Sequence, residues 1–130
     1  MARILVVDDE ATVLNLFEAI LKSLGHGVLT ASSGRRGVEI YRRYRPMATI
    51  LDLHLPDMNG IEVLTEIRTV DPHAPVLIWT EADTEGLEYE ARQRGVTDFL
   101  VKGFSLHELG ATLRGVLKQD HRALSAVSPS

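Results

Sequence analysis

The stretch Ile4-Leu5-Val6-Val7-Asp8-Asp9-Glu10 decides the fold of this chain. Four apolar residues in a row are typical of a strand that is buried on both faces, as in a parallel sheet. Three consecutive acids follow at once, and a carboxylate at the end of a buried strand is costly to desolvate unless a cation or hydrogen bonds stabilise it. The stretch therefore predicts a buried strand that carries acidic side chains to the edge of a sheet.

Three later apolar runs also end in a polar residue that can take part in chemistry. The runs cover residues 48–51, 76–79 and 99–101, and the residues that follow them are Asp52, Thr80 and Lys102. Because the carboxyl ends of parallel strands meet at one edge of a sheet, we expect these groups to lie near Asp8 and Asp9. This geometry predicts a site for a divalent metal ion and a phosphoryl group.

The whole chain alternates short apolar runs with helical patterns. Strands are predicted at residues 4–7, 28–31, 48–51, 76–79 and 97–101. Helices are predicted at residues 9–24, from an N-cap at Ser32 to about 44, after Gly60, at about 83–94, and from a capping box at Ser105. This pattern predicts an α/β domain with a doubly wound parallel sheet and helices on both faces. The second strand, at residues 28–31, ends without a polar group that could take part in the site. It is therefore expected at the outer edge of the sheet, which predicts the five-stranded, flavodoxin-like order 2-1-3-4-5.

Composition limits the possible classes of protein. With 130 residues, of which 45% are hydrophobic, the chain fits one globular domain, predicted at residues 1–120, with 121–130 as a polar tail or the start of a linker. The absence of cysteine excludes disulfides and thiolate metal sites. The first apolar run is too short for a signal peptide or a membrane span, so we expect a cytoplasmic protein without membrane contact. A net charge of −4 disfavours direct nucleic-acid binding.

The polar strand ends suggest specific roles. Asp9 and Asp52 are candidates for direct Mg²⁺ ligands, Asp8 for holding a metal-bound water, and a backbone carbonyl after Asp52 for a further ligand. Asp52 is the candidate nucleophile toward phosphorus, while Lys102 and the Thr80 hydroxyl are expected to contact phosphoryl oxygens. Simpler interpretations remain open, namely helix capping for the first two acids, an Asx turn for Asp52, and strand-end positions for Lys102 and Thr80.

Taken together, these motifs resemble the receiver domain of two-component response regulators. The resemblance covers residues 4–118 and rests on Asp8-Asp9-Glu10, Leu51–Gly60, Thr80 and Phe99–Lys102. It implies that Asp52 accepts a phosphoryl group from a sensor histidine kinase or a phosphotransfer protein, with Mg²⁺ as cofactor and the His54 backbone carbonyl as the loop ligand. It also implies that the Phe99 ring follows Thr80 inward on activation. The domain would be a signalling switch that catalyses only its own phosphotransfer and slow dephosphorylation, and not an enzyme otherwise.

Three positions depart from the family pattern. Glu81 stands where a small residue is usual, Gly103 where Pro is usual, and Phe99 where Tyr is commoner. Glu81 adds negative charge near the phosphoryl site, and the Lys102–Gly103 bond is expected to be trans, since a cis bond without Pro is costly. Glu81 and Gly103 support the alternative function, a phosphorylation-independent pseudo-receiver that acts as an interaction scaffold.

Other functions fit the sequence less well. A dinucleotide oxidoreductase needs a Gly-rich turn after the first strand, and three acids there would repel a pyrophosphate. An aspartyl-nucleophile phosphatase or a flavin protein would need a different loop in the same place. The cognate kinase, the output domain or partner protein, and whether the chain is a stand-alone receiver or part of a larger regulator remain open.

Three further features are interpreted as structural. The arginines at 35, 36, 42 and 43 are expected to form the solvated face of a helix. Trp79 is expected to pack in the core or on the surface rather than to stack on a nucleotide. The five histidines have no metal-ligand spacing and are expected on the surface or in loops.

Overall fold

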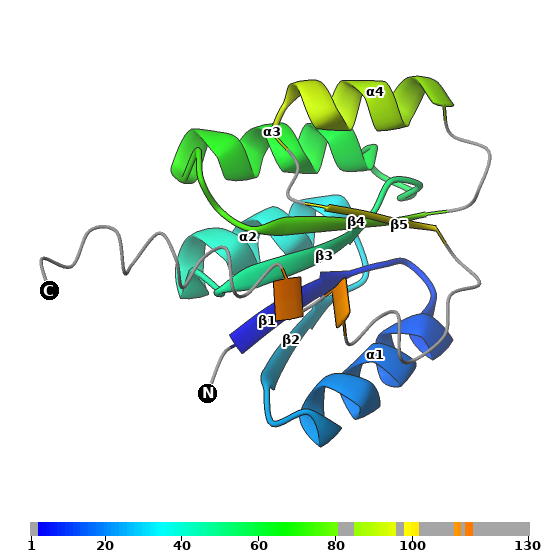
Figure 1. Cartoon of the computed structure of the whole chain (residues 1–130), viewed down its shortest axis with the longest axis vertical. Helices are drawn as coiled ribbons and strands as arrows, with labels where there is room; N and C mark the ends of the chain where they lie inside the picture. The colour runs from blue at the N-terminus through cyan, green and yellow to red at the C-terminus, as the bar shows by residue number, and fades with distance from the viewer. Residues whose placement is uncertain (1–2, 81–84, 96–97, 102–110, 113, 116–130) are drawn as a thin grey trace, which may run out of the picture.

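The computed structural model of the chain has a parallel sheet of five strands with helices on both of its faces (Figure 1). It describes residues 3–80, 85–95, 98–101, 111–112 and 114–115. The strands are β1 (Arg3–Val7), β2 (Gly27–Ala31), β3 (Ala48–Asp52), β4 (Val76–Thr80) and β5 (Asp98–Val101). The helices are α1 (Ala11–Ser23), α2 (Gly34–Tyr44), α3 (Gly60–Val70) and α4 (Glu85–Gln93).

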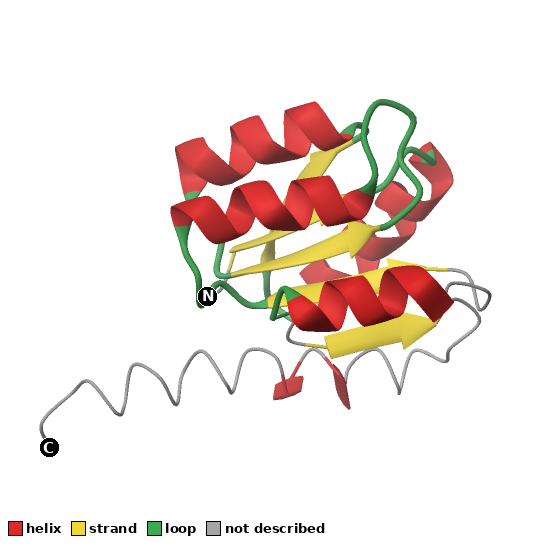
Figure 2. Cartoon of the chain, turned by 90° about the horizontal axis from the view of Figure 1, so that it is seen from above, coloured by secondary structure: helices red, strands yellow, loops and turns green. Residues whose placement is uncertain are grey.

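The order of the strands is β2-β1-β3-β4-β5, which confirms the predicted doubly wound arrangement. All four pairs of neighbouring strands are parallel, and their arrows point the same way in Figure 2. Val7 pairs with Leu51 and Asp52 pairs with Trp79. The carboxyl ends of β1, β3 and β4 therefore lie level with one another, and the residues that follow β1 meet the end of β3.

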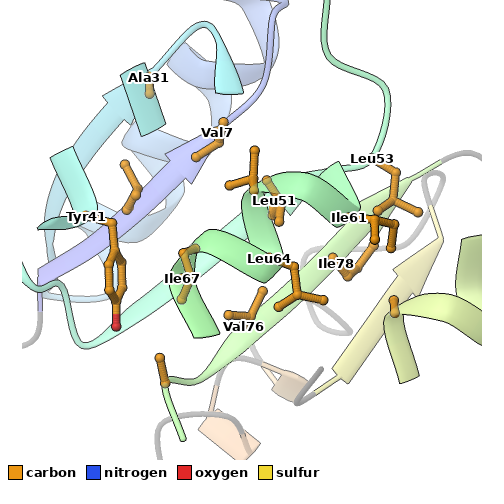
Figure 3. Close-up of a cluster of buried hydrophobic side chains, with 14 of the residues drawn as sticks. Val7, Ala31, Tyr41, Leu51, Leu53, Ile61, Leu64, Ile67, Val76 and Ile78 are labelled. Carbon is orange, nitrogen blue, oxygen red and sulfur yellow. The ribbon is translucent and has the colours of Figure 1, made fainter. Parts of the chain in front are cut away.

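Alternating side chains of the strands fill two separate cores, as expected for a sheet that is covered on both faces. On one face, α2, α3 and α4 pack on a cluster that includes Leu51, Leu64 and Ile78 (Figure 3). On the other face, Phe17 and Leu21 of α1 pack against the alternate residues of the strands, such as Val6 and Ile50. Residues 4–7, 48–52 and 76–79 of β1, β3 and β4 are buried, which explains why these sequences read as continuous apolar runs.

Local hydrogen bonds explain where three helices begin, and they correct two predictions. The side chain of Ser33, rather than the predicted Ser32, caps α2 by accepting the Arg36 amide at 3.2 Å. The first helix begins at Ala11 and not at Asp9, because Asp8 and Glu10 hold the preceding turn through a hydrogen bond. A capping box between Asn59 and Glu62 opens α3, a signal that the sequence analysis did not use.

Several surface expectations agree with the structure. The four arginines of α2 are exposed, as predicted for a solvated helix face. His54 and His73 are exposed and His26 lies half-buried in a loop, while the other two histidines and the Ser105 capping box lie outside the described residues. No helix in the described ranges is long and apolar enough to cross a membrane.

Candidate functional site

The loop between β1 and α1 brings three carboxylates together. One oxygen of each of Asp8, Asp9 and Glu10 lies within 4.8 Å of one oxygen of each of the others. Asp8 is fully buried, whereas Asp9 and Glu10 are exposed. Like charges this close repel one another, so a bound cation would relieve the repulsion. Glu10 was not among the predicted ligands, although the run of three acids was a signal for it.

The Asp8 side chain accepts two hydrogen bonds, and its backbone donates a third. Its Oδ1 accepts the backbone N–H of Glu10 at 2.9 Å, and its Oδ2 accepts the indole N–H of Trp79 at 3.2 Å. The Asp8 amide in turn donates to the Ala31 carbonyl at the end of β2, at 3.1 Å. The position of this carboxylate is therefore determined by its own turn, by β2 and by β4.

Asp52 ends β3 with only 2% of its surface exposed. Val7 of β1 pairs with Leu51 of β3. Asp8 and Asp52 are the residues that follow this pair, so they lie level with each other at the carboxyl ends of the two strands. Asp52 Oδ1 accepts the His54 amide at 3.1 Å, which is the Asx turn that the sequence left open. Among the described residues, Asp52 is not part of the 4.8 Å acidic cluster, so the structure brings it to the same sheet edge but not into that group.

The chain after Asp52 folds back tightly on the end of β3. The Gly60 amide donates to the Leu53 carbonyl at 2.9 Å. A Cβ atom on Gly60 would lie 2.6 Å from the Asp52 carbonyl oxygen and 2.7 Å from Leu53 Cα. Only glycine fits this approach without a shift of backbone, so Gly60 helps to define the position of Asp52. The sequence offered Gly60 as a turn residue but did not show this contact.

Asp57 ties the same loop to α2. Its Oδ1 accepts the Gly34 amide at 2.8 Å and its Oδ2 accepts the Arg35 amide at 2.9 Å. These amides are at the first turn of α2, where backbone N–H groups lack partners within the helix. The hydrogen bonds from Arg35 and Gly34 hold the pKa of the Asp57 carboxyl below its usual value. The loop that carries the end of β3 is thus attached to a second element by a charged cap.

The remaining predicted site residues are described only in part. The backbone of Thr80 ends β4 and pairs with Val101, and the backbone of Phe99 pairs with Ile78. For residues 80 and 98–101, the side chains lie outside the described part of the structure. Lys102, Glu81 and Gly103 lie entirely outside it, so the roles of these residues and the trans bond after Lys102 stay predictions.

Comparisons with known proteins agree with this arrangement. A family model described as "Response regulator receiver domain" matches residues 4–114. The chain is 35% identical over 117 residues to the transcriptional regulatory protein TrcR of Mycobacterium tuberculosis, a match that covers 90% of this chain and 46% of that protein. It is 32% identical over 117 residues to the chemotaxis protein CheY of Thermotoga maritima, covering 89% of this chain and 98% of that one.

A solved structure shows the same fold. The response regulator receiver domain protein of Clostridium thermocellum superposes with a TM-score of 0.90 at 29% identity, covering 95% of this chain and 99% of that chain. The chain spans about half the length of several transcriptional regulators that it matches. Because the family model covers most of the sequence and the sheet order and acidic strand ends agree with it, this chain belongs to the response regulator receiver domain family.

Proposed function

We propose that Asp52 is the phosphoacceptor of this receiver domain and that its phosphorylation changes how the domain docks on partners. The observation that carries the proposal is the position of Asp52. It is a nearly buried carboxylate at the carboxyl end of β3, beside the strand that ends in three clustered acids. A carboxylate in such a place is suited to nucleophilic attack on phosphorus.

The proposed donor is a phosphohistidine of a sensor histidine kinase or a phosphotransfer protein. A carboxylate oxygen of Asp52 forms a bond to phosphorus while the phosphorus–nitrogen bond of the phosphohistidine breaks. The electron pair of that bond stays on the imidazole nitrogen, which takes up a proton from solvent. The product is an acyl phosphate on Asp52 and a neutral histidine on the donor.

The described residues fit a Mg²⁺ ion, because the clustered groups are carboxylates and offer the oxygen ligands that this ion prefers. Asp9 and Asp52 are proposed as direct ligands, Asp8 as the holder of a metal-bound water, and the His54 carbonyl as the backbone ligand. When bound, the ion would neutralise charge on the transferring phosphoryl group. Lys102 and the Thr80 hydroxyl are proposed to contact the phosphoryl oxygens.

The wider role is proposed from the same family membership. The domain is proposed to occupy residues 1–120, with 121–130 as a tail or linker outside the described part, and to work in the cytoplasm. Some relatives are transcriptional regulators about twice as long as the matched region, so an output domain is one possible partner. A scaffold that works without phosphorylation is not favoured, because Asp52 and the acids after β1 are all present.

Intact-mass measurement after incubation with acetyl phosphate and Mg²⁺ tests the proposal. The wild type should gain one phosphoryl group and Asp52→Asn none. Asp57→Asn is the matched control, since it removes an exposed acid from the same loop and should still be phosphorylated. Phosphorylation of Asp52→Asn to the wild-type extent would overturn the assignment, and a wild type that gains nothing would favour the scaffold function.

A further inference from the structure

A buried hydrogen bond joins the acidic loop after β1 to β4, the strand that ends in the proposed switch threonine. The indole Nε1–H of Trp79 donates to Asp8 Oδ2 at 3.2 Å, across 71 residues of sequence. Asp8 is 0% exposed and Trp79 is 8% exposed. A buried indole N–H needs an acceptor, and here the acceptor is a carboxylate of the acidic cluster rather than a backbone carbonyl.

The indole ring is held in place by the core. Phe17 of α1 meets the Trp79 ring edge-on, with the ring centroids 4.9 Å apart and the planes at 89°. Phe17 is itself 1% exposed, and the Trp79 backbone pairs with Asp52 in the sheet. The indole therefore cannot turn away from Asp8 without disturbing α1 or β4. Its N–H is a donor with a fixed direction.

We propose that Trp79 is a positioning residue for the divalent ion, acting through Asp8. This inference rests on the proposed function and deepens it. The Glu10 amide holds one oxygen of Asp8 and the Trp79 indole holds the other, so the two donors restrict rotation of the carboxylate. An indole N–H has no lone pair to offer a metal ion, so its effect on the ion passes through the carboxylate that it orients.

Removal of this donor should weaken ion binding. Partners that orient a metal ligand typically change affinity by about 10–100-fold when they are lost, and we expect about 10-fold because Asp8 keeps the Glu10 amide. A role in packing alone would instead lower the stability of the fold and leave the affinity for the ion unchanged.

The chain permits a substitution that removes the N–H with little change in the shape of the side chain. Trp79 is the only tryptophan in the sequence, so growth of a tryptophan auxotroph on β-(3-benzothienyl)alanine replaces this one indole N–H by sulfur. Isothermal titration with Mg²⁺ should show about 10-fold weaker binding for this protein and for Trp79→Phe. Leu77→Val is the control, because it loosens the same core cluster but removes no hydrogen-bond donor, and it should bind Mg²⁺ like the wild type.

A double-mutant cycle tests whether the effect passes through Asp8. In an Asp8→Ala background, Trp79→Phe should cause no further loss of Mg²⁺ affinity. An equal loss in both backgrounds, or wild-type affinity in the benzothienyl protein, would overturn the inference and leave the proposed function intact. A wild type that binds no Mg²⁺ and accepts no phosphoryl group would overturn both.

Discussion

The guanidinium group of Arg68 in α3 donates a hydrogen bond of 2.6 Å to the backbone carbonyl of Gly95, just after α4. The same group donates to the carbonyls of Arg94 at 3.0 Å, Ala74 at 2.7 Å and, more weakly, Asp71 at 3.4 Å. One side chain thus joins the end of α3, the loop before β4 and the end of α4. Burial lowers the pKa of Arg68, but an arginine remains charged, so these carbonyls interact with a full positive charge.

Arg68→Lys should lower the free energy of unfolding by about 1–3 kcal/mol, because a lysine cannot reproduce hydrogen bonds to carbonyls on three segments. Urea unfolding measures the loss, and amide hydrogen exchange should be faster at the end of α4. Arg42→Lys is the control, since its ion pair with Glu66 is exposed and contributes about 1 kcal/mol or less. Equal losses in the two variants would contradict the structural role of Arg68.

Gly60→Ala should destabilise the protein by about 1–3 kcal/mol, because the new methyl group would overlap the backbone of Asp52 and Leu53. The same shift should slow phosphorylation of Asp52 by acetyl phosphate. Gly115→Ala is the matched control, as a Cβ there meets nothing within 4 Å, and its stability should be unchanged or slightly higher. Thermal melting compares the two, and equal melting temperatures would refute the close approach at Gly60.

Asp57→Asn should change how stability depends on pH. The amides of Arg35 and Gly34 lower the folded pKa of Asp57 below 3.8, so the carboxylate stabilises the fold above that pH. This contribution is lost as the pH falls from the unfolded pKa through the lower folded pKa. Urea titrations from pH 6 down to pH 2 should therefore show a shallower loss in Asp57→Asn than in the wild type. Glu39→Gln removes an exposed acid of α2, the helix whose first amides bind Asp57, and should keep the wild-type slope.

Mg²⁺ should stabilise the wild type, because the ion relieves repulsion among Asp8, Asp9 and Glu10. Linkage gives about 2.7 kcal/mol at a hundredfold excess of ion over its dissociation constant. Trp79 contacts Asp8, so its fluorescence should change as Mg²⁺ binds. Asp9→Asn should reduce both responses. A wild type that shows neither a fluorescence change nor a higher melting temperature would argue against a metal site.

Thr80→Ala should leave phosphorylation of Asp52 largely intact while uncoupling it from β5. The expected signal is a shift of amide resonances around Phe99 on addition of a phosphoryl mimic, present in the wild type and absent in the variant. Thr69→Ala removes a hydroxyl that donates within α3 to the Glu66 carbonyl at 2.6 Å, and this variant should respond like the wild type. Equal responses in wild type and Thr80→Ala would exclude this route of coupling.

Sequence reasoning correctly predicted the order of the sheet and the pattern of strands and helices as far as β5, while the helix predicted from Ser105 lies outside the described residues. Continuous apolar runs mark strands that are buried on both sides, and the polar residues at their ends show which edge carries the chemistry. Asp8, Asp9 and Asp52 could be named as candidates in this way because Asp52 ends β3 and the other two are the first two residues after β1. Local boundaries were less reliable. Ser32 and Ser33 are both good N-caps, and only the backbone conformation decides that Ser33 accepts the hydrogen bond.

The sequence by itself determined which donors and acceptors exist and which runs of residues form buried strands. Only the tertiary structure decided how they pair: Trp79 with Asp8 across 71 residues, Arg68 with Gly95 across 27, and Asp57 with Gly34 across 23. The physical reason is that a hydrogen bond requires heavy atoms about 3 Å apart in a defined direction. Such placement depends on strand register and rotamers set by the whole core, whereas periodicity reports only whether a side chain faces inward or outward.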